Sequence, residues 1–229
     1  MYGEQYENGY KIEVYGYPKQ AASSDYGLFI GGLGNAVEIT HQSKLGYCVF
    51  RKKISISAND TYTILNTVPS IDKSLVFIRP TNQNAVVSIS RDNKVIYSNA
   101  QTDVYVLVFT TDFTLVPTDY GLNIYNQKVT LSYSSNYLPF LVGANITLTQ
   151  QGVTAKFARP MLQANECAEM IDRVYQNWTY CRAGGYRFQG NKITIQPGRN
   201  LEWVFVDTSA IDYITYSTPS YVIDFDLYF

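Results

Sequence analysis

Acidic side chains near the C-terminus are the residues of this chain that could do chemistry. Asp224 and Asp226 alternate with apolar residues and would lie on one face of a strand, and Asp207 or Asp212 could approach them. A pair of carboxylates can hydrolyse a glycosidic bond or bind a calcium ion. Carboxylates at alternate strand positions also occur simply on a solvated face, and this interpretation is favoured here.

The sequence offers few other groups that titrate or attack near neutral pH. Its single histidine, His41, lies in a polar stretch typical of a solvated loop. Cys48, Cys167 and Cys181 have no metal or redox spacing and are predicted to be buried free thiols. The glycine-rich residues 31–34 lack the Lys-Ser/Thr ending of a phosphate-binding loop. We therefore expect no enzyme activity, no cofactor and no metal.

The composition favours surfaces that contact other molecules. Tyrosine occurs 21 times in 229 residues, more often than lysine and arginine together (18), and it is enriched both in sheets and at interfaces. A net charge of −1 provides no basic surface for nucleic acid or for an anionic membrane. No secretory signal or membrane-spanning apolar run is visible. We expect a protein that is assembled in the cytoplasm and inserts into no membrane.

Short apolar and alternating segments predict an all-β fold, mainly an antiparallel β-sandwich. Residues 53–57 and 87–90 alternate with a period of two, whereas residues 75–78 and 104–109 are continuous apolar runs typical of strands buried on both faces. Asp92-Asn93 and Gly190-Asn191 are turn dipeptides and predict hairpins. Apolar residues at every second position from Tyr221 predict a last strand that continues to Phe229.

A short helix is predicted near residues 165–176. Gly184-Gly185 would end any helical continuation, and Asn165 could act as its N-cap. Its apolar stripe, at helical spacings of three and four, consists of Cys167, Met170, Ile171, Val174 and Tyr175.

Three short words recur in the same order along the chain. They lie at residues 25–30 and 119–124, 77–80 and 157–160, and 93–95 and 191–193. Together they predict two related β units with the helix inserted in the second. The predicted organisation is an N-terminal arm (1–24), a first β unit (25–118) and a second β unit (119–229).

The longest repeated word resembles the "YGL-x-(I/V)-x-N" opening of small tail proteins encoded by tailed bacteriophages. Asp25–Ile30 and Asp119–Asn126 carry the resemblance, and the serine-containing segment Lys128–Ser134 follows the second copy. This chain departs from that pattern by carrying the word twice and by its N-terminal extension and inserted helix. The resemblance implies an oligomeric virion part near the tail tip or fibre, assembled in the host cytoplasm, and it implies no active-site residues.

Three functions remain open at this point. The favoured one is a structural tail protein whose partners are itself, as a homotrimer, other tail proteins and a host-surface glycan. The alternative is a carbohydrate-binding, receptor-binding β-sandwich, since aromatic faces stack on sugars, and the least favoured is a glycoside hydrolase or depolymerase that uses the aspartates. Candidate interface residues are Tyr10, Tyr15, Tyr17, Tyr26, Tyr120, Tyr221, Phe225 and Phe229.

Overall fold

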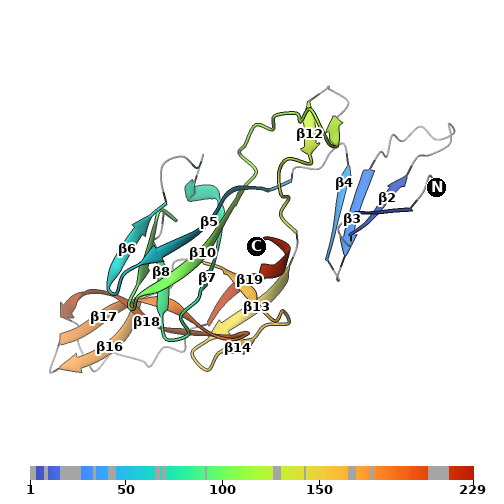
Figure 1. Cartoon of the computed structure of the whole chain (residues 1–229). Helices are drawn as coiled ribbons and strands as arrows, with labels where there is room; N and C mark the ends of the chain where they lie inside the picture. Colours follow the sequence, from blue (N-terminus) through green and yellow to red (C-terminus); the bar gives the residue numbers. More distant parts are fainter. Residues whose placement is uncertain are drawn as a thin grey trace. The chain divides into compact units, whose positions relative to one another are not determined.

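A computed structural model shows that the chain is built from β-strands (Figure 1). It describes residues 4–7, 10–15, 27–32, 35–40, 45–64, 68, 71–90, 92–125, 130–141, 143–164, 169–175, 178–205 and 217–229. Every strand pairing whose register is defined is antiparallel. Within these residues the helical elements are single 3-10 turns such as η1 (Ile71–Lys73) and η3 (Phe225–Leu227). The predicted all-β, sandwich-like fold is confirmed.

The chain divides into two compact units, each assembled from separate stretches of sequence. Unit 1 comprises residues 1–48 and 110–143, and unit 2 comprises residues 49–109 and 144–229. This division by contacts does not follow the predicted boundaries after residues 24 and 118. The duplication itself stays a prediction.

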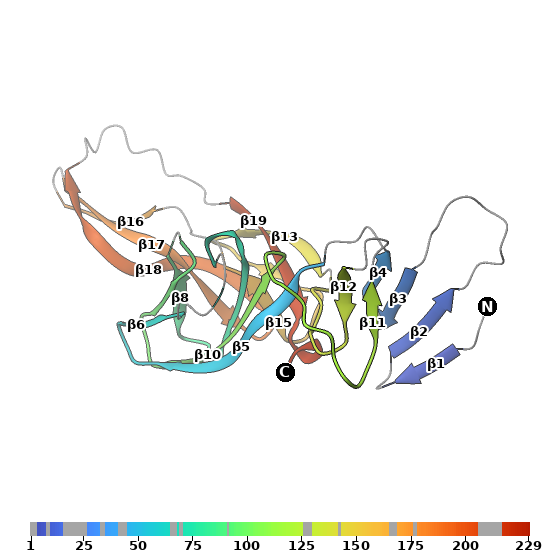
Figure 2. The same ribbon diagram turned by 90° about the horizontal axis from the view of Figure 1, so that it is seen from above.

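Unit 2 contains a six-stranded and a seven-stranded sheet. The first has the order β13-β19-β15-β7-β10-β5, and the second has the order β14-β18-β17-β8-β9-β6, with β16 paired to β17. Figure 2 shows β17 and β18 as long curved ribbons that extend past the shorter strands. The strands of the first sheet are β5 (Tyr47–Ile56), β7 (Leu75–Pro80), β10 (Thr102–Thr110), β13 (Ala144–Thr149), β15 (Pro160–Gln163) and β19 (Ser217–Asp224). Those of the second are β6 (Asp60–Thr63), β8 (Val86–Ile89), β9 (Val95–Ser98), β14 (Val153–Thr154), β16 (Glu169–Tyr175), β17 (Trp178–Gln189) and β18 (Lys192–Phe205).

The main core of unit 2 lies between these two sheets. Alternation along β7 and β10 sends one set of side chains inward, including Val76, Ile78 and Val106. Tyr186 of β17 and Ile193 of β18 meet them from the seven-stranded sheet, and all five are at most 1% exposed. Burying each such side chain contributes about 1.5–3 kcal/mol.

The opposite, outer face of the six-stranded sheet is also apolar along β7 and β10. Phe77, Leu107 and Phe109 are the alternate residues of these strands, and they too are at most 1% exposed. The Phe77 and Phe109 rings meet edge to face at 5.8 Å, and Tyr228 meets Phe109 at 5.3 Å. Both faces of these strands are therefore buried, as their continuous apolar runs predict.

Two hairpin turns also match their sequence predictions. Asn93, between β8 and β9, has a φ of 59°, and Gly190, between β17 and β18, has a φ of 65°. Asparagine and glycine tolerate this left-handed conformation better than other residues. The Asn93 side chain also donates to the Ser74 carbonyl oxygen at 3.2 Å, which fixes the turn to the loop before β7.

Unit 1 contains a four-stranded and a two-stranded sheet. A small cluster around the buried Tyr47 and Tyr133 packs beside the second of these. The four-stranded sheet has the order β1 (Glu4–Glu7), β2 (Tyr10–Tyr15), β3 (Gly27–Gly32) and β4 (Asn35–Thr40). The two-stranded sheet pairs β11 (Asn123–Tyr125) with β12 (Leu131–Ser134).

The predicted helix near residues 165–176 is wrong. Residues 169–175 form β16, which pairs with β17, while residues 165–168 lie outside the described residues. A register shift between Ile171 and Arg173 leaves Asp172 as an extra residue in β16. Because of the bulge, Ile171 and Val174 lie opposite Cys181 and Thr179, which are two residues apart in β17. Ile171 and Val174 therefore have the same parity in the ladder, although they are three residues apart in sequence. Met170 and Tyr175 are at the other parity, so the apolar residues of β16 fall on both faces of the strand and their helical spacing does not mark a single face.

The predicted C-terminal strand is correct only up to Asp224. Residues 225–227 form η3 instead of continuing to Phe229, because the Tyr228 and Phe229 N–H groups donate to the Phe225 carbonyl oxygen at 3.0 and 3.1 Å and the Asp224 side chain caps the turn. The turn folds the last aromatic residues back over Tyr105 of β10.

A buried hydroxyl in β18 gives a test of this packing. Thr194 is 7% exposed, and its Oγ1 has no hydrogen-bond partner. We expect Thr194→Val, which keeps the side-chain shape, to raise the free energy of unfolding by about 1 kcal/mol, because an unsatisfied buried hydroxyl is costly. Urea denaturation measures the change, with Thr61→Val at an exposed position of β6 as the control. A destabilised Thr194→Val variant would contradict the packing described here.

Candidate functional site

The outer face of the six-stranded sheet becomes polar along β13, β15 and β19, and a shallow pocket lies there. Asn145 of β13 is opposite Tyr221 of β19, and Thr147 is opposite Pro219. In the register between β15 and β19, Leu162 is opposite Val222, so the next pair along is Gln163 and Tyr221. Asn145, Tyr221 and Gln163 thus form one row across three neighbouring strands.

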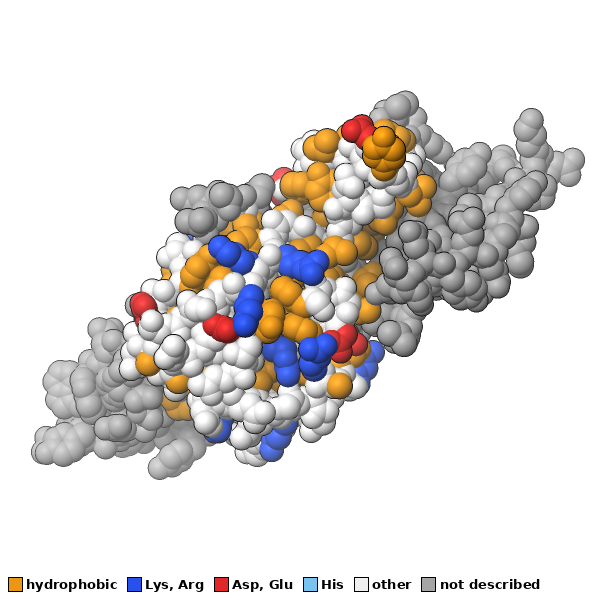
Figure 3. All heavy atoms as spheres, in the orientation of Figure 1, with side chains coloured by type: hydrophobic (Ala, Val, Ile, Leu, Met, Phe, Trp, Pro, Cys, Tyr) orange, Lys and Arg blue, Asp and Glu red, His pale blue; other side chains and the backbone are white. Residues whose placement is uncertain are grey.

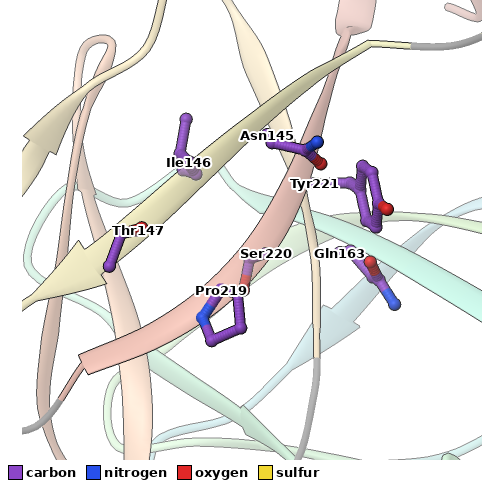
Figure 4. Close-up of a pocket in the computed structure, with 7 residues that line it drawn as sticks. All are labelled: Asn145, Ile146, Thr147, Gln163, Pro219, Ser220 and Tyr221. Atoms are coloured by element: carbon purple, nitrogen blue, oxygen red, sulfur yellow. The ribbon is translucent and has the colours of Figure 1, made fainter.

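The row lies where β15 ends while β19 continues. The register between these strands covers Val222–Asp224, so residues 217–221 of β19 extend beyond it, with β13 on their other side. The resulting space has a volume of about 520 Å³. Figure 4 shows the Asn145 amide, the Tyr221 phenol and the Gln163 amide gathered on one side of β19. The lining residues are Asn145, Ile146, Thr147, Gln163, Pro219, Ser220 and Tyr221.

The chemistry of this pocket, hereafter the Tyr221 pocket, is neutral. Tyr221 is 44% exposed and offers a ring face and a hydroxyl, while Asn145 and Gln163 each offer an amide donor and acceptor. None of the seven lining residues is charged. The pocket therefore combines hydrogen-bonding groups with an apolar ring face, and its lining contains no carboxylate, imidazole or thiol.

A second distinctive surface lies in unit 1, on residues 116–138, hereafter the β11–β12 segment. Among the described residues, six large hydrophobic side chains are strongly exposed, and five of them lie on this segment. Tyr120, at 92%, is the most exposed of the six. In Figure 3, hydrophobic side chains gather on the surface over β12. The five residues are Val116, Tyr120, Leu122, Tyr125 and Leu138.

Hydrogen bonds hold the turn that presents Tyr120. The Thr118 hydroxyl donates to the Tyr120 carbonyl oxygen at 2.5 Å, and the Asn123 amide donates to the Thr118 carbonyl oxygen at 2.9 Å. The Leu122 N–H donates to the Ser135 hydroxyl at 3.0 Å. Gly121 has a φ of 130°, and a Cβ at this position would overlap Ser135 Oγ. The exposed ring is thus displayed by an ordered turn.

The candidate interface residues have separate locations. Tyr120 and Tyr221 are exposed on units 1 and 2, respectively. Tyr10 and Tyr15 lie in β2, whose side chains are outside the description, and Tyr17 and Tyr26 lie outside the described residues.

Phe225 and Phe229 take part in packing within unit 2. Phe225 is 5% exposed and stacks on the partly buried Phe229 at 5.1 Å. Tyr105 meets both rings edge to face at 4.8 Å. Arg51 lies 5.2 Å from the centre of the Phe229 ring and Arg159 lies 4.5 Å from that of Phe225. Because its ring is buried by residues of the same chain, Phe225 offers little surface to a partner.

The two C-terminal aspartates have partners in the turn that follows β19. Asp224 caps η3 by accepting from the Asp226 N–H at 3.2 Å, and Asp226 pairs with Arg159. Burial raises the pKa of Asp224, and Arg159 offsets this shift in part. Asp207 and Asp212 lie outside the described residues, as does His41. The geometry gives Asp224 and Asp226 a role in holding η3 over the aromatic cluster.

Three further observations concern metal ions, membranes and cysteines. Within the described parts of the chain, no group of three or more His, Cys, Asp or Glu side chains could hold a metal ion. No helix among the residues searched is long and apolar enough to cross a membrane. Cys48 is partly buried and forms no disulfide, Cys167 lies outside the description, and Cys181 lies in β17 with its side chain undescribed.

A model of the family of unknown function DUF6453 matches residues 2–207. The chain belongs to this family. No curated protein and no solved structure matches it. The part of the chain that matches the DUF6453 family includes the β11–β12 segment and strands β13 and β15, whereas β19, which carries Tyr221, follows it.

Sequence reasoning named Tyr221 but missed its polar neighbours. Asn145 and Thr147 alternate with Ile146 and Leu148, a pattern that indicates a strand with one polar face. No local pattern could show that β13 and β15 both pair with β19, which is more than 50 residues away in sequence. The pocket is therefore a product of the sheet order.

The turn at Gly121 allows a matched comparison of two glycine substitutions. We expect Gly121→Ala to cost about 2 kcal/mol or more, because the substitution strains the backbone and the added Cβ overlaps Ser135 Oγ. Gly190→Ala, where a Cβ meets nothing within 4 Å, should cost only about 1 kcal/mol. Urea denaturation gives the two values, and hydrogen exchange at Leu122 and Ser135 should accelerate only in the first variant. Equal costs would contradict the ordered turn.

The contributions of the Asp224 and Asp103 carboxyls to folding stability should depend on pH in opposite directions. Because burial raises the pKa of Asp224, its contribution to stability is present at low pH and is lost as the pH rises through its folded-state pKa. Hydrogen bonds from Lys53 and Ser55 lower the pKa of Asp103, so its contribution is present above the unfolded-state pKa and is lost on acidification.

The comparison uses Asp224→Asn and Asp103→Asn in urea denaturation between about pH 3 and pH 7. The stability of the wild-type chain relative to Asp224→Asn should fall as the pH rises, and its stability relative to Asp103→Asn should increase. The same sign of slope for both variants would show that Asp224 is not held in the buried capping position.

Proposed function

We propose that this member of the DUF6453 family is a non-enzymatic structural component of a bacteriophage tail, at the tail tip or fibre. It assembles there with copies of itself, as a homotrimer, and with other virion proteins, and it contributes to host attachment. The resemblance of the repeated word to small tail proteins supports the viral assignment. The exposed β11–β12 segment, which contains the second copy of that word, supports the assembly role.

The concentration of exposed apolar side chains on the β11–β12 segment carries this proposal. Soluble monomers rarely leave a contiguous apolar patch uncovered, and large aromatic side chains are preferred anchors of protein interfaces. Tyr120 and Leu122 are 92% and 43% exposed, while unit 2 leaves only Tyr221 strongly exposed among its described large hydrophobic residues. Hydrogen bonds order the turn before any partner arrives, which lowers the entropic cost of association.

The β11–β12 segment would form the central part of a larger contact. A stable protein interface buries about 800 Å² on each partner, which five side chains do not supply alone. Removal of a central aromatic anchor should still weaken association strongly, because a few residues dominate the energy of an interface. The less exposed surface around them would exclude water from the contact.

A carbohydrate-binding function is the second candidate, and the Tyr221 pocket favours it. The least supported candidate is a glycoside hydrolase. Asp224 caps η3 and Asp226 pairs with Arg159, so both carboxylates have structural partners in the turn that follows β19.

The assembly role predicts the mass of the purified chain in solution. Light scattering coupled to size-exclusion chromatography should give an oligomer, with a trimer expected. The double variant Tyr120→Ser, Leu122→Ser should dissociate about tenfold or more readily, because both side chains lose buried apolar area. Tyr221→Ser, which removes the exposed aromatic residue of unit 2, is the matched control and should remain oligomeric.

A wild-type chain that stays monomeric at all concentrations, or a double variant that assembles normally, would contradict this surface as the assembly contact. The tail assignment has its own test in purified particles of the phage that encodes the chain. Mass spectrometry should detect the chain in a fixed ratio to other tail proteins. Its absence from washed particles would overturn the assignment.

A further inference from the structure

We infer that the Tyr221 pocket binds an uncharged sugar residue of a surface polysaccharide. This inference deepens the host-attachment part of the proposed function and rests on it for the source of the sugar. The site is the row of Asn145, Tyr221 and Gln163 on the outer face of the six-stranded sheet, with Thr147 and Pro219 beside it.

The dimensions of the row suit a pyranose ring. Neighbouring strands lie about 4.8 Å apart, so three strands place the Asn145 and Gln163 backbones about 10 Å apart with Tyr221 between them. A sugar ring that lies against the central phenol would present its hydroxyl groups to an amide on each side. Figure 4 shows both amides on the same side of β19 as the Tyr221 ring.

The chemistry of the row also suits a sugar. A pyranose combines an apolar face of C–H groups with a rim of hydroxyls that both donate and accept hydrogen bonds. The exposed Tyr221 ring matches the apolar face, and the side-chain amides of Asn145 and Gln163 can each donate and accept at once. Pro219 extends the apolar floor without adding a backbone donor, because proline has no N–H.

The absence of charge around the pocket disfavours other ligands. An anionic sugar, a phosphate or a nucleic-acid strand would require a cation, and no Lys or Arg lines the pocket. A bound metal would require carboxylates or imidazoles, and the pocket has neither. A peptide could add beside β13, the end strand of the six-stranded sheet among the described residues, by backbone hydrogen bonds. Such a ligand would not depend on the Tyr221 ring, so the variants below distinguish it.

An open, shallow site of this kind should bind a single sugar weakly, with a dissociation constant of about millimolar. A polysaccharide that repeats the sugar would engage several copies of an assembled protein at once. Linked sites bind by effective concentration, so the apparent affinity for the polymer should exceed that for the monosaccharide by about 100-fold or more.

The test uses the purified full chain on a printed array of uncharged and anionic oligosaccharides of the kinds found on bacterial surfaces. We expect binding to one or more uncharged glycans, with little effect of added salt. The array hit, as a free monovalent oligosaccharide, is then titrated by saturation-transfer NMR. Tyr221→Ala should weaken this binding about tenfold or more, as expected for the loss of one stacked ring.

Further variants separate stacking from folding. Tyr221→Phe keeps the ring and should bind within about threefold of the wild type, whereas Gln163→Ala and Asn145→Ala should each weaken binding, since each removes hydrogen bonds to hydroxyls. Tyr120→Ser changes an exposed tyrosine of unit 1 and should leave monovalent binding unchanged. Thermal unfolding of each variant serves as the folding control.

No binding to any uncharged glycan would overturn the inference. So would salt-sensitive binding confined to anionic glycans, or wild-type affinity in a folded Tyr221→Ala variant. Because monovalent binding does not require assembly or a virion, these outcomes are independent of the particle and oligomer measurements. A chain found in tail particles that binds no sugar would retain the proposed structural function and lose only this site.

Discussion

The burial of both faces of β7 and β10 is the constraint on which the rest of unit 2 depends. Alternating side chains of these strands fill the core between the sheets on one side and form an aromatic layer on the other. The outer layer must be shielded from water, and the C-terminal residues 225–229, which form and follow η3, supply Phe225, Tyr228 and Phe229 for this purpose. Arg159 holds the turn through its carbonyl oxygen and its pair with Asp226.

The same constraint determines where a ligand can bind. The turn η3 covers the outer face near β10 and the start of β15, whereas the part of this face along β19 and β13 is exposed. There the outward residues change from aromatic to polar, with Asn145 and Thr147 on β13 and Gln163 at the end of β15. One sheet face is thus apolar where its own chain covers it and hydrogen-bonding where solvent reaches it. Tyr221 lies in the open part, which distinguishes it from the buried Phe225 four residues later.

Sequence patterns predicted the local elements well where one physical signal dominated. The hairpins at Asn93 and Gly190 and the doubly buried β7 and β10 follow directly from turn chemistry and apolar runs. The prediction was wrong at β16, where apolar residues on both faces of a bulged strand matched a helical spacing. It was also wrong at residues 225–229, where hydrogen bonds to the Phe225 carbonyl oxygen form a turn in place of the strand. The pocket could not be predicted because its row joins residues 145, 163 and 221 through sheet order alone. The exposure of Tyr120 likewise depends on the Thr118 and Asn123 hydrogen bonds, which no pattern reveals.

The two proposed surfaces are physically complementary. A neutral, open pocket has no charge to increase its affinity, so a single copy would release a sugar quickly. Repetition of that pocket in an oligomer converts weak contacts into durable attachment, because dissociation then requires several sites to open together. The β11–β12 segment is chemically suited to produce such repetition, since its exposed side chains are apolar and its turn is already ordered. A protein that uses one surface for assembly and another for sugar binding needs no catalytic group. Its affinity for a surface would come from the number of copies, and its selectivity from the few hydrogen bonds around Tyr221.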